Sequence, residues 1–288
     1  METANPITLN KILVATDFSE CSSNAIKYAS YLAAQSGASL VLFNSVGVPG
    51  ASSDMLVNPL HLLEKIASDR LENAVGKLKE DAKKAWGKDL DISCQVRAGF
   101  PSENILQVAE EESVDVLLVG TKGIRKGVAW LLGSTSSEVV RRSKVPVLAV
   151  PCDAPTNILE KIVVAADLQE MSGATLEPVF ALAQLFNSQL EVLHVIPPQE
   201  HFSPSAFEAF KSEFMDACPL EKVTFHLFET DESAVATAIQ DYVQFQNADL
   251  VVMTSRPRSL LGRLFHPSAS KKLSLETTVP LLVLHEQI

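Results

Sequence analysis

An internal repeat constrains the fold of this chain more than any other feature of its sequence. Lys11–Asp17 reads KILVATD, and five of these seven residues recur at Lys161–Asp167, which reads KIVVAAD. Further on, Asp115–Val119 (DVLLV) matches Asp249–Met253 (DLVVM). The residue numbers differ by 150 in the first match and by 134 in the second, so the second copy is shorter between the two matches. Two matches in the same order predict two related structural units.

Each unit alternates short β-branched apolar runs with stretches of helical periodicity, which is typical of buried parallel strands joined by helices. In the first unit we expect strands near residues 11–16, 39–46, 90–97, 115–119 and 145–150. In the second we expect them near 161–166, 189–196, 223–228, 249–253 and 279–284. Apolar residues from Leu60 to Leu78 predict a long amphipathic helix between the second and third strands of the first unit. The residues missing from the second copy fall in the same interval.

This order predicts an α/β protein made of two tandem, doubly wound, parallel five-stranded sheets with right-handed crossovers. The segment 151–157 contains two prolines and no periodicity, so it is interpreted as a linker. We therefore expect one domain at residues 1–152 and a second at residues 157–288.

The charge of the chain excludes one class of function. The formal net charge is −11 and the isoelectric point is near 5.0, whereas a nucleic-acid binder needs a basic face. No apolar run reaches the length of a membrane helix, and no early apolar segment resembles a signal sequence. We expect a cytoplasmic protein that contacts neither nucleic acid nor membrane.

The cysteines and histidines show no metal-binding pattern. Cys21, Cys94, Cys152 and Cys218 lie far apart, without a C-x-x-C pair, and the six histidines are dispersed. The expectation is that all four thiols are reduced and that the chain holds no metal through them.

One glycine-rich stretch has the composition of a phosphate site. Gly120 and Gly123 follow the fourth strand of the first unit, and Gly133, Ser134 and Thr135 stand where a helix is expected to begin. Glycine permits positive φ and close approach of the backbone to a ligand. The free N–H groups and the dipole of a helix N-terminus attract phosphate.

Basic residues in the intervening loop, Lys122, Arg125 and Lys126, add positive charge. Taken alone, the glycines are equally explained as turn residues, with Ser134 as a plain helix cap. Position favours a binding site, because ligands of open α/β sheets lie beyond the carboxyl ends of the strands where the winding reverses. With a strand order of 3-2-1-4-5, Asp17 and Gly120 would meet in that crevice.

The whole chain resembles the universal stress protein family in its tandem form. ATP-binding members of that family carry G-x2-G-x9-G-[S/T], which Gly120, Gly123, Gly133 and Ser134 match in full. Residues 16–19, TDFS, are similar to the family's T-D-x-S opening. The resemblance implies an adenine nucleotide α-hydrolase-like fold, with two units packed as a pseudo-two-fold pair through their last strands.

The resemblance also implies roles for individual residues. Thr16 and Asp17 would lie against the adenosine, and the backbone near Ser45 would contact the adenine. Gly120 and Gly123 would face the ribose and phosphates, with Lys122 adding charge, while Gly133, Ser134 and Thr135 would hold the phosphates. The family usually has His-Val where this chain has Asn44-Ser45. The expected ligand is ATP, AMP or another adenylate, with or without Mg²⁺.

The second unit lacks the same pattern. At an offset of 134, the three glycines become Thr254, Pro257 and Pro267, and only Ser268 is retained. Proline has no N–H to donate and cannot adopt positive φ. We expect one nucleotide site, in the first unit.

Two classes of function remain open. The favoured one is a stress-response or regulatory module that binds an adenine nucleotide and is not an enzyme. The alternative is a slow Mg²⁺-dependent ATP hydrolase or nucleotidyl transferase that uses the same site. Phosphoryl transfer usually needs a positioned base and carboxylate support for a metal, and Asp17 is the only acid expected in the crevice. Whether the pseudo-dimer forms a further homodimer is left open.

Overall fold

The structure is a computed structural model. It describes residues 8–47, 57–121, 132–156, 159–166, 173–196, 202–231, 235–254 and 279–285. The chain divides into two compact units, one made of residues 9–123 and 132–156 and the other containing residues 157–288. They are called here the N-terminal half and the C-terminal half.

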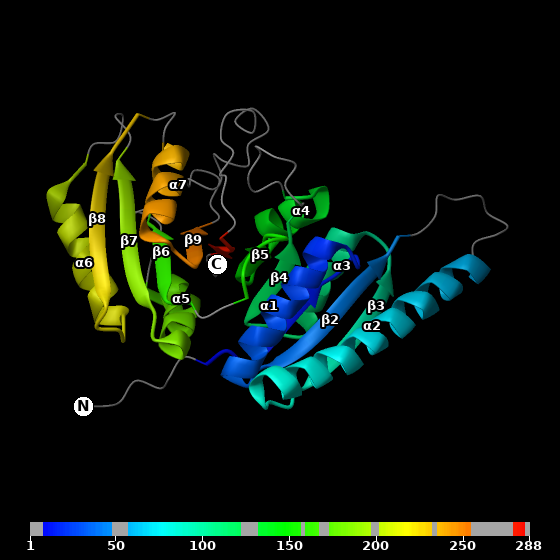
Figure 1. The fold of residues 1–288 in the computed structure, drawn as a ribbon. Helices are drawn as coiled ribbons and strands as arrows, with labels where there is room; N and C mark the ends of the chain where they lie inside the picture. The colour runs from blue at the N-terminus through cyan, green and yellow to red at the C-terminus, as the bar shows by residue number, and fades with distance from the viewer. Residues whose placement is uncertain are drawn as a thin grey trace. The chain divides into compact units, whose positions relative to one another are not determined.

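The N-terminal half is a parallel sheet with helices between its strands (Figure 1, blue to green). Its strands are β1 (Lys11–Ala15), β2 (Ser39–Val46), β3 (Ile92–Ala98), β4 (Val116–Gly120) and β5 (Val147–Val150). Its helices are α1 (Glu20–Ser36), α2 (Val57–Trp86), α3 (Pro101–Glu111) and α4 (Ser134–Arg142). The strand order β3-β2-β1-β4-β5 confirms the predicted order, and every neighbouring pair is parallel. Helix α1 packs beside α2, and α3 packs beside α4.

The C-terminal half repeats this architecture (Figure 1, green through yellow to red). Its strands are β6 (Lys161–Ala165), β7 (Gln189–Ile196), β8 (Val223–Glu229), β9 (Leu250–Thr254) and β10 (Leu281–Leu284). Its described helices are α5 (Gly173–Phe186), α6 (Pro204–Ala217) and α7 (Val235–Gln246). The order β10-β9-β6-β7-β8 is the same one, and Ile162 pairs with Leu250 as Ile12 pairs with Val116.

The apolar runs form the central strands of each sheet, which are buried on both faces. In β1, Ile12, Leu13 and Val14 are fully buried, as are Ile162, Val163 and Val164 in β6. Helix α1 begins at a side-chain cap, where Ser19 accepts a hydrogen bond from the Ser22 N–H, and ends at Gly37, whose φ of 80° suits a residue without a Cβ.

The structure locates the length difference between the copies more finely than the sequence does. The interval between β7 and β8 is much shorter than the interval between β2 and β3. Most of the difference lies in the helix, because α6 has 14 residues where α2 has 30. The interval between β8 and β9 is, in contrast, slightly longer than that between β3 and β4. The net offset between the copies therefore combines one large deletion with a small insertion.

Among the described helices, none combines the length and the apolar character needed to cross a membrane.

Candidate functional site: a polar cavity in the N-terminal half

A cavity of about 440 Å³ lies at the carboxyl ends of β1, β2 and β4 in the N-terminal half. β1 and β4 are neighbours in the sheet, and the chain winds away from them in opposite directions, so this is the crevice expected of a doubly wound fold. Seven of the nine predicted site residues line it: Thr16, Asp17, Ser45, Gly120, Gly133, Ser134 and Thr135. The other two, Lys122 and Gly123, lie outside the described residues, as do Arg125 and Lys126.

The TDFS segment forms one wall of the cavity as a tight turn between β1 and α1. The Thr16 side-chain oxygen lies 2.9 Å from the Ser22 hydroxyl and accepts a hydrogen bond from the Phe18 N–H at 2.9 Å. Asp17 Oδ1 accepts from the Ser19 N–H at 2.9 Å, and Phe18 takes a φ of 63°. Thr16 is buried and serves the turn itself, whereas the Asp17 side chain is exposed.

Local hydrogen bonds lower the pKa of the Asp17 carboxyl, which is ionised at neutral pH. Partial burial raises the pKa of this carboxyl, but hydrogen bonds from Ser19 and Ser22 outweigh that effect, so the pKa lies below its usual value. The wall near β1 thus carries a fixed negative charge. It suits a ligand that presents hydroxyl groups or a cation on this side.

The opposite wall is the first turn of α4, with Gly133 as its N-cap. Helix geometry leaves the N–H groups of the first turn without an intrahelical acceptor, and the helix dipole adds partial positive charge there. Ser136 Oγ donates to the Gly120 carbonyl at 2.9 Å, which fixes this turn against the end of β4. The predicted helix start at Gly133 and Ser134 is confirmed.

Position 120 requires glycine for a different reason from the one expected. Its φ is not positive. A Cβ at this position would lie 2.8 Å from Cys21 C and from Ser22 N, and 2.9 Å from Cys21 O. Glycine is required because the first turn of α1 packs directly on the end of β4, not because the backbone is strained.

Ser45, at the carboxyl end of β2, is supported by a residue that the sequence interpretation missed. Asn104 of α3 donates from Nδ2 to Ser45 Oγ at 2.9 Å, so the Ser45 hydroxyl proton is left to point elsewhere. Ile105, one residue further along α3, contributes apolar surface to the cavity. Pro101, at the first turn of α3, also lines the cavity, and no motif in the sequence links this helix to the site.

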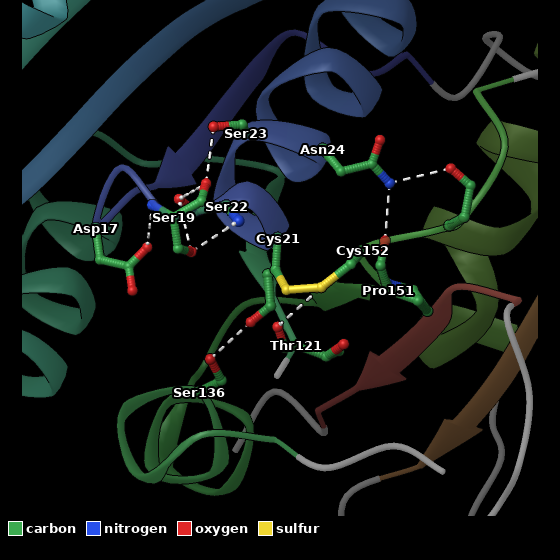
Figure 2. The surroundings of a disulfide bond; sticks show 12 residues. Asp17, Ser19, Cys21, Ser22, Ser23, Asn24, Thr121, Ser136, Pro151 and Cys152 are labelled. Carbon is green, nitrogen blue, oxygen red and sulfur yellow. Dashed lines mark hydrogen bonds between the residues drawn. A yellow bond between two sulfur atoms is a disulfide. The ribbon is translucent and has the colours of Figure 1, made fainter. Parts of the chain in front are cut away.

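The expectation of four reduced cysteines was wrong for two of them. Cys21 and Cys152 form a disulfide bond, with their Cα atoms 4.1 Å apart (Figure 2). Cys94 and Cys218 are free. Cys21 stands in the first turn of α1 and lines the cavity, and Cys152 follows β5. No sequence motif predicts this disulfide. Both cysteines nevertheless follow strands that flank β4, which places them at the same edge of the sheet.

The segment interpreted as a linker is partly held by the N-terminal half. Asn24 Nδ2 donates to the carbonyls of Pro151 and Ala154, at 2.8 and 3.0 Å (Figure 2). Pro151 and Ala154 are both buried. The chain beyond β5 is thus clamped onto α1 beside the disulfide.

In the C-terminal half, the residue that corresponds to Gly120 is Thr254, the buried last residue of β9. Asp167, Pro257, Pro267 and Ser268 lie outside the described residues. Within the part of the chain that the structure describes, no group of three or more His, Cys, Asp or Glu side chains is placed to hold a metal ion.

The fold and the cavity define a class of protein: a tandem, doubly wound α/β protein with a polar pocket at the switch point of its first sheet. Comparison with known proteins agrees. The universal stress protein family matches residues 8–151 and again residues 159–285. The chain belongs to the universal stress protein family, with two copies of the family domain.

Individual relatives match one copy or the whole chain. Universal stress protein YxiE of Bacillus subtilis is 30% identical over 145 residues, covering 49% of this chain and 98% of the relative. Universal stress protein MJ0577 of Methanocaldococcus jannaschii is 26% identical over 159 residues, covering 50% of this chain and 96% of the relative. The crystal structure of a universal stress protein from Archaeoglobus fulgidus matches 96% of this chain and 99% of its own, with a TM-score of 0.74 and 20% identity, which shows the shared tandem fold.

Proposed function

We propose that this protein is a stress-response or regulatory module that binds one adenine nucleotide, ATP or another adenylate such as AMP, in the cavity of its N-terminal half. One observation carries the proposal. The TDFS turn and the N-terminus of α4 face a single cavity at the switch point, with the dimensions of a small-molecule site. Membership of the universal stress protein family supports the class of function.

The chemistry of the two walls suggests how the ligand lies. The N-terminus of α4 offers backbone donors to phosphate oxygens. The ionised Asp17 carboxylate suits ribose hydroxyl groups, or a Mg²⁺ ion carried by the phosphates. Ser45 and Ile105 lie at the remaining side, where an adenine ring would find one hydrogen-bonding group and one apolar contact.

We propose binding rather than turnover. Asp17 is the only carboxylate among the described residues that line the cavity. Its lowered pKa makes it a weak base. An attacking water would therefore find no strong general base in this part of the wall, and phosphoryl transfer depends on such positioning. We also propose a cytoplasmic protein whose two halves pair as a pseudo-dimer.

The test begins with the full chain as purified. Mass spectrometry of the released ligand should identify an adenylate, and ATP added with Mg²⁺ should be hydrolysed more slowly than about 1 per second, a rate at the low end for enzymes. Faster turnover would overturn the assignment as a binding module.

A matched pair of variants tests the site. Gly133→Pro removes one N–H donor at the cap of α4, whereas Gly133→Ala keeps it, and the φ of −62° accommodates both residues. Loss of one hydrogen bond to a charged group should weaken ATP binding by about tenfold in the proline variant alone. Equal affinities in the two folded variants would show that the α4 N-terminus does not hold the ligand.

A further inference from the structure

The Cys21–Cys152 disulfide joins two walls of the proposed nucleotide cavity. Cys21 lines the cavity from the first turn of α1. Cys152 Sγ lies 3.9 Å from the carbonyl oxygen of Thr121, a buried residue that also lines the cavity and directly follows Gly120 (Figure 2). The bond therefore joins the first turn of α1, which follows the turn that carries Asp17, to the segment after β5 that contacts the start of the glycine-rich segment.

The contact at Gly120 makes this connection sensitive to small movements. The backbone of Cys21 packs so closely on Gly120 that not even a Cβ fits between them. Any shift of the first turn of α1 changes the distance between the Asp17 side and the β4 side of the cavity. The sulfur atoms tie Cys21 to Cys152, whose Sγ lies beside the Thr121 carbonyl next to Gly120, so breaking the bond releases one of the restraints that set the cavity width.

The pair is also placed where it can react. Cys21 and Cys152 are both partly exposed rather than buried, which favours access by a small thiol. Burial raises the pKa of the free Cys94 thiol, with Glu72 adding to the effect, and burial also raises the pKa of the Cys218 thiol. Those two thiols are poor nucleophiles at neutral pH, so they compete little for exchange.

The surrounding hydrogen bonds favour a reversible couple. Asn24 holds the carbonyls of Pro151 and Ala154 independently of the sulfur atoms, so Cys152 stays beside α1 after reduction. The reduced Cys152 thiol also has an acceptor within reach, the Thr121 carbonyl. Both redox states therefore have a defined local arrangement, and the reduced thiols remain at high effective concentration for re-oxidation.

We propose that Cys21 and Cys152 form a redox-active site, reduced by low-molecular-weight thiols of the glutathione class, whose oxidation state sets the nucleotide affinity of the cavity. This inference rests on the proposed function. The oxidised form holds the cavity walls in place and binds the nucleotide more tightly. By reciprocity of linked equilibria, a bound nucleotide protects the disulfide from reduction.

The exchange is balanced by two molecules of thiol. The first, as a thiolate, attacks one protein sulfur, so that the Sγ–Sγ bond breaks, a mixed disulfide forms and the other cysteine leaves as a thiolate that takes up a proton. The second thiolate attacks the mixed disulfide, which releases the small-molecule disulfide and the second cysteine thiolate. Two electrons pass from the small thiols to the protein, and oxidation by the small-molecule disulfide reverses both steps.

The experiment uses the full chain carrying Cys94→Ser and Cys218→Ser, which leaves only the reactive pair to be counted. The protein is equilibrated in buffers of graded glutathione and glutathione disulfide, with and without saturating Mg·ATP, then quenched with acid, alkylated and measured by mass spectrometry. Saturating ATP should raise the ratio [GSH]²/[GSSG] at half-reduction by at least about fivefold, the lower end of typical coupling between sites. The ATP affinity of the oxidised and reduced forms, from calorimetry, should differ by the same factor.

Cys152→Ser provides the control, because its ATP affinity should equal that of the reduced protein and should not respond to reductant. Equal midpoints with and without ATP, together with equal affinities of the two forms, would overturn the inference and leave the proposed function standing. If neither form binds ATP, the proposed function fails and the inference fails with it.

Discussion

The two halves agree at the amino ends of their strands. In the N-terminal half, Asp115 Oδ2 accepts hydrogen bonds from the N–H groups of residues 10 and 11, at 2.6 and 2.8 Å. In the C-terminal half, Asp249 Oδ2 accepts from the N–H groups of residues 160 and 161, at 2.9 and 3.0 Å. Each aspartate joins the start of the fourth strand to the start of the first, so the same pair of hydrogen bonds aligns these strands in both halves.

The two halves also share a side-chain contact to the backbone just after their first strands. Asn44 Nδ2 donates to the Thr16 carbonyl at 2.7 Å, and at the corresponding position His194 Nδ1 lies 2.9 Å from the Ala166 carbonyl oxygen. A different residue type makes the same connection. The two positions themselves differ, because Ala166 has no hydroxyl with which to make the hydrogen bonds that Thr16 makes.

At the end of the fourth strand the divergence becomes steric. Gly120 lets α1 pack onto β4, whereas the C-terminal half places the buried Thr254 there. The aspartates that join the strand starts recur in both copies. Two glycines that line the cavity, Gly120 and Gly133, do not recur, whereas Asp17 and Ser134 keep their counterparts Asp167 and Ser268.

The largest effect is expected when Gly120 is replaced by threonine, the residue at the corresponding position of the C-terminal half. Gly120→Thr forces a branched side chain against backbone atoms of Cys21 and Ser22 that cannot rotate away. Overpacking of this kind should lower the free energy of unfolding of the N-terminal half by about 3 kcal/mol. Hydrogen exchange followed by mass spectrometry reports each half separately, and ATP binding should be lost.

The reverse substitution, Thr254→Gly, is the matched control. It should destabilise the C-terminal half by only about 1 kcal/mol through the added freedom of glycine in a strand. It should not create a nucleotide site. If Gly120→Thr were as mild as this control, the close packing of α1 on β4 would not be what requires a glycine.

Removing the aspartate hydrogen bonds at the strand starts should affect the two halves alike. Asp115→Ala and Asp249→Ala each leave two backbone N–H groups at a partly buried strand start without their acceptor. Each change should lower the free energy of unfolding of its own half by about 2 kcal/mol. Urea denaturation monitored by hydrogen exchange measures both, and a change that destabilises only one half would contradict the shared role.

The smallest expected effect concerns a buried acidic residue of the C-terminal half. Glu191 in β7 is buried at 3% exposure, and its carboxylate accepts hydrogen bonds from Thr224 at 2.6 Å and Tyr242 at 3.1 Å, with His226 Nε2 2.7 Å away. The N-terminal half has Val41 at the corresponding place.

Burial and the neighbouring Glu191 carboxylate raise the pKa of Tyr242 far above its usual value, so its hydroxyl stays a donor at every ordinary pH. Tyr242→Phe should cost the C-terminal half about 1 kcal/mol, the worth of one hydrogen bond. Thermal unfolding of the variant checks this, and Val41→Ile in the other half is a conservative control. An unchanged melting temperature for Tyr242→Phe would show that Glu191 does not need this donor.

Much of this architecture could be predicted from the sequence, because the residues that form the strands and join their starts belong to the internal repeat. Lys11 and Asp115 recur at fixed offsets, and the apolar runs between turns give the strands with only small errors at their ends. The position of Gly133 and Ser134 at a helix start follows from the same reasoning.

The contacts between segments far apart in the sequence could not be predicted. Cys21 and Cys152 are 131 residues apart, and only the strand order brings them together. Asn104 reaches Ser45 from a helix that follows the next strand, a contact of two ordinary polar residues with no motif. The reason for Gly120 was misjudged because sequence shows that a side chain is absent but not what occupies its space.

The proposed function gives the N-terminal half one nucleotide site and the C-terminal half none. Equilibrium dialysis of the full oxidised chain with labelled ATP measures this directly as a stoichiometry. We expect saturation at one ATP per chain, with that single site weakened by Gly133→Pro. Saturation at two ATP per chain, or one site indifferent to Gly133→Pro, would contradict it.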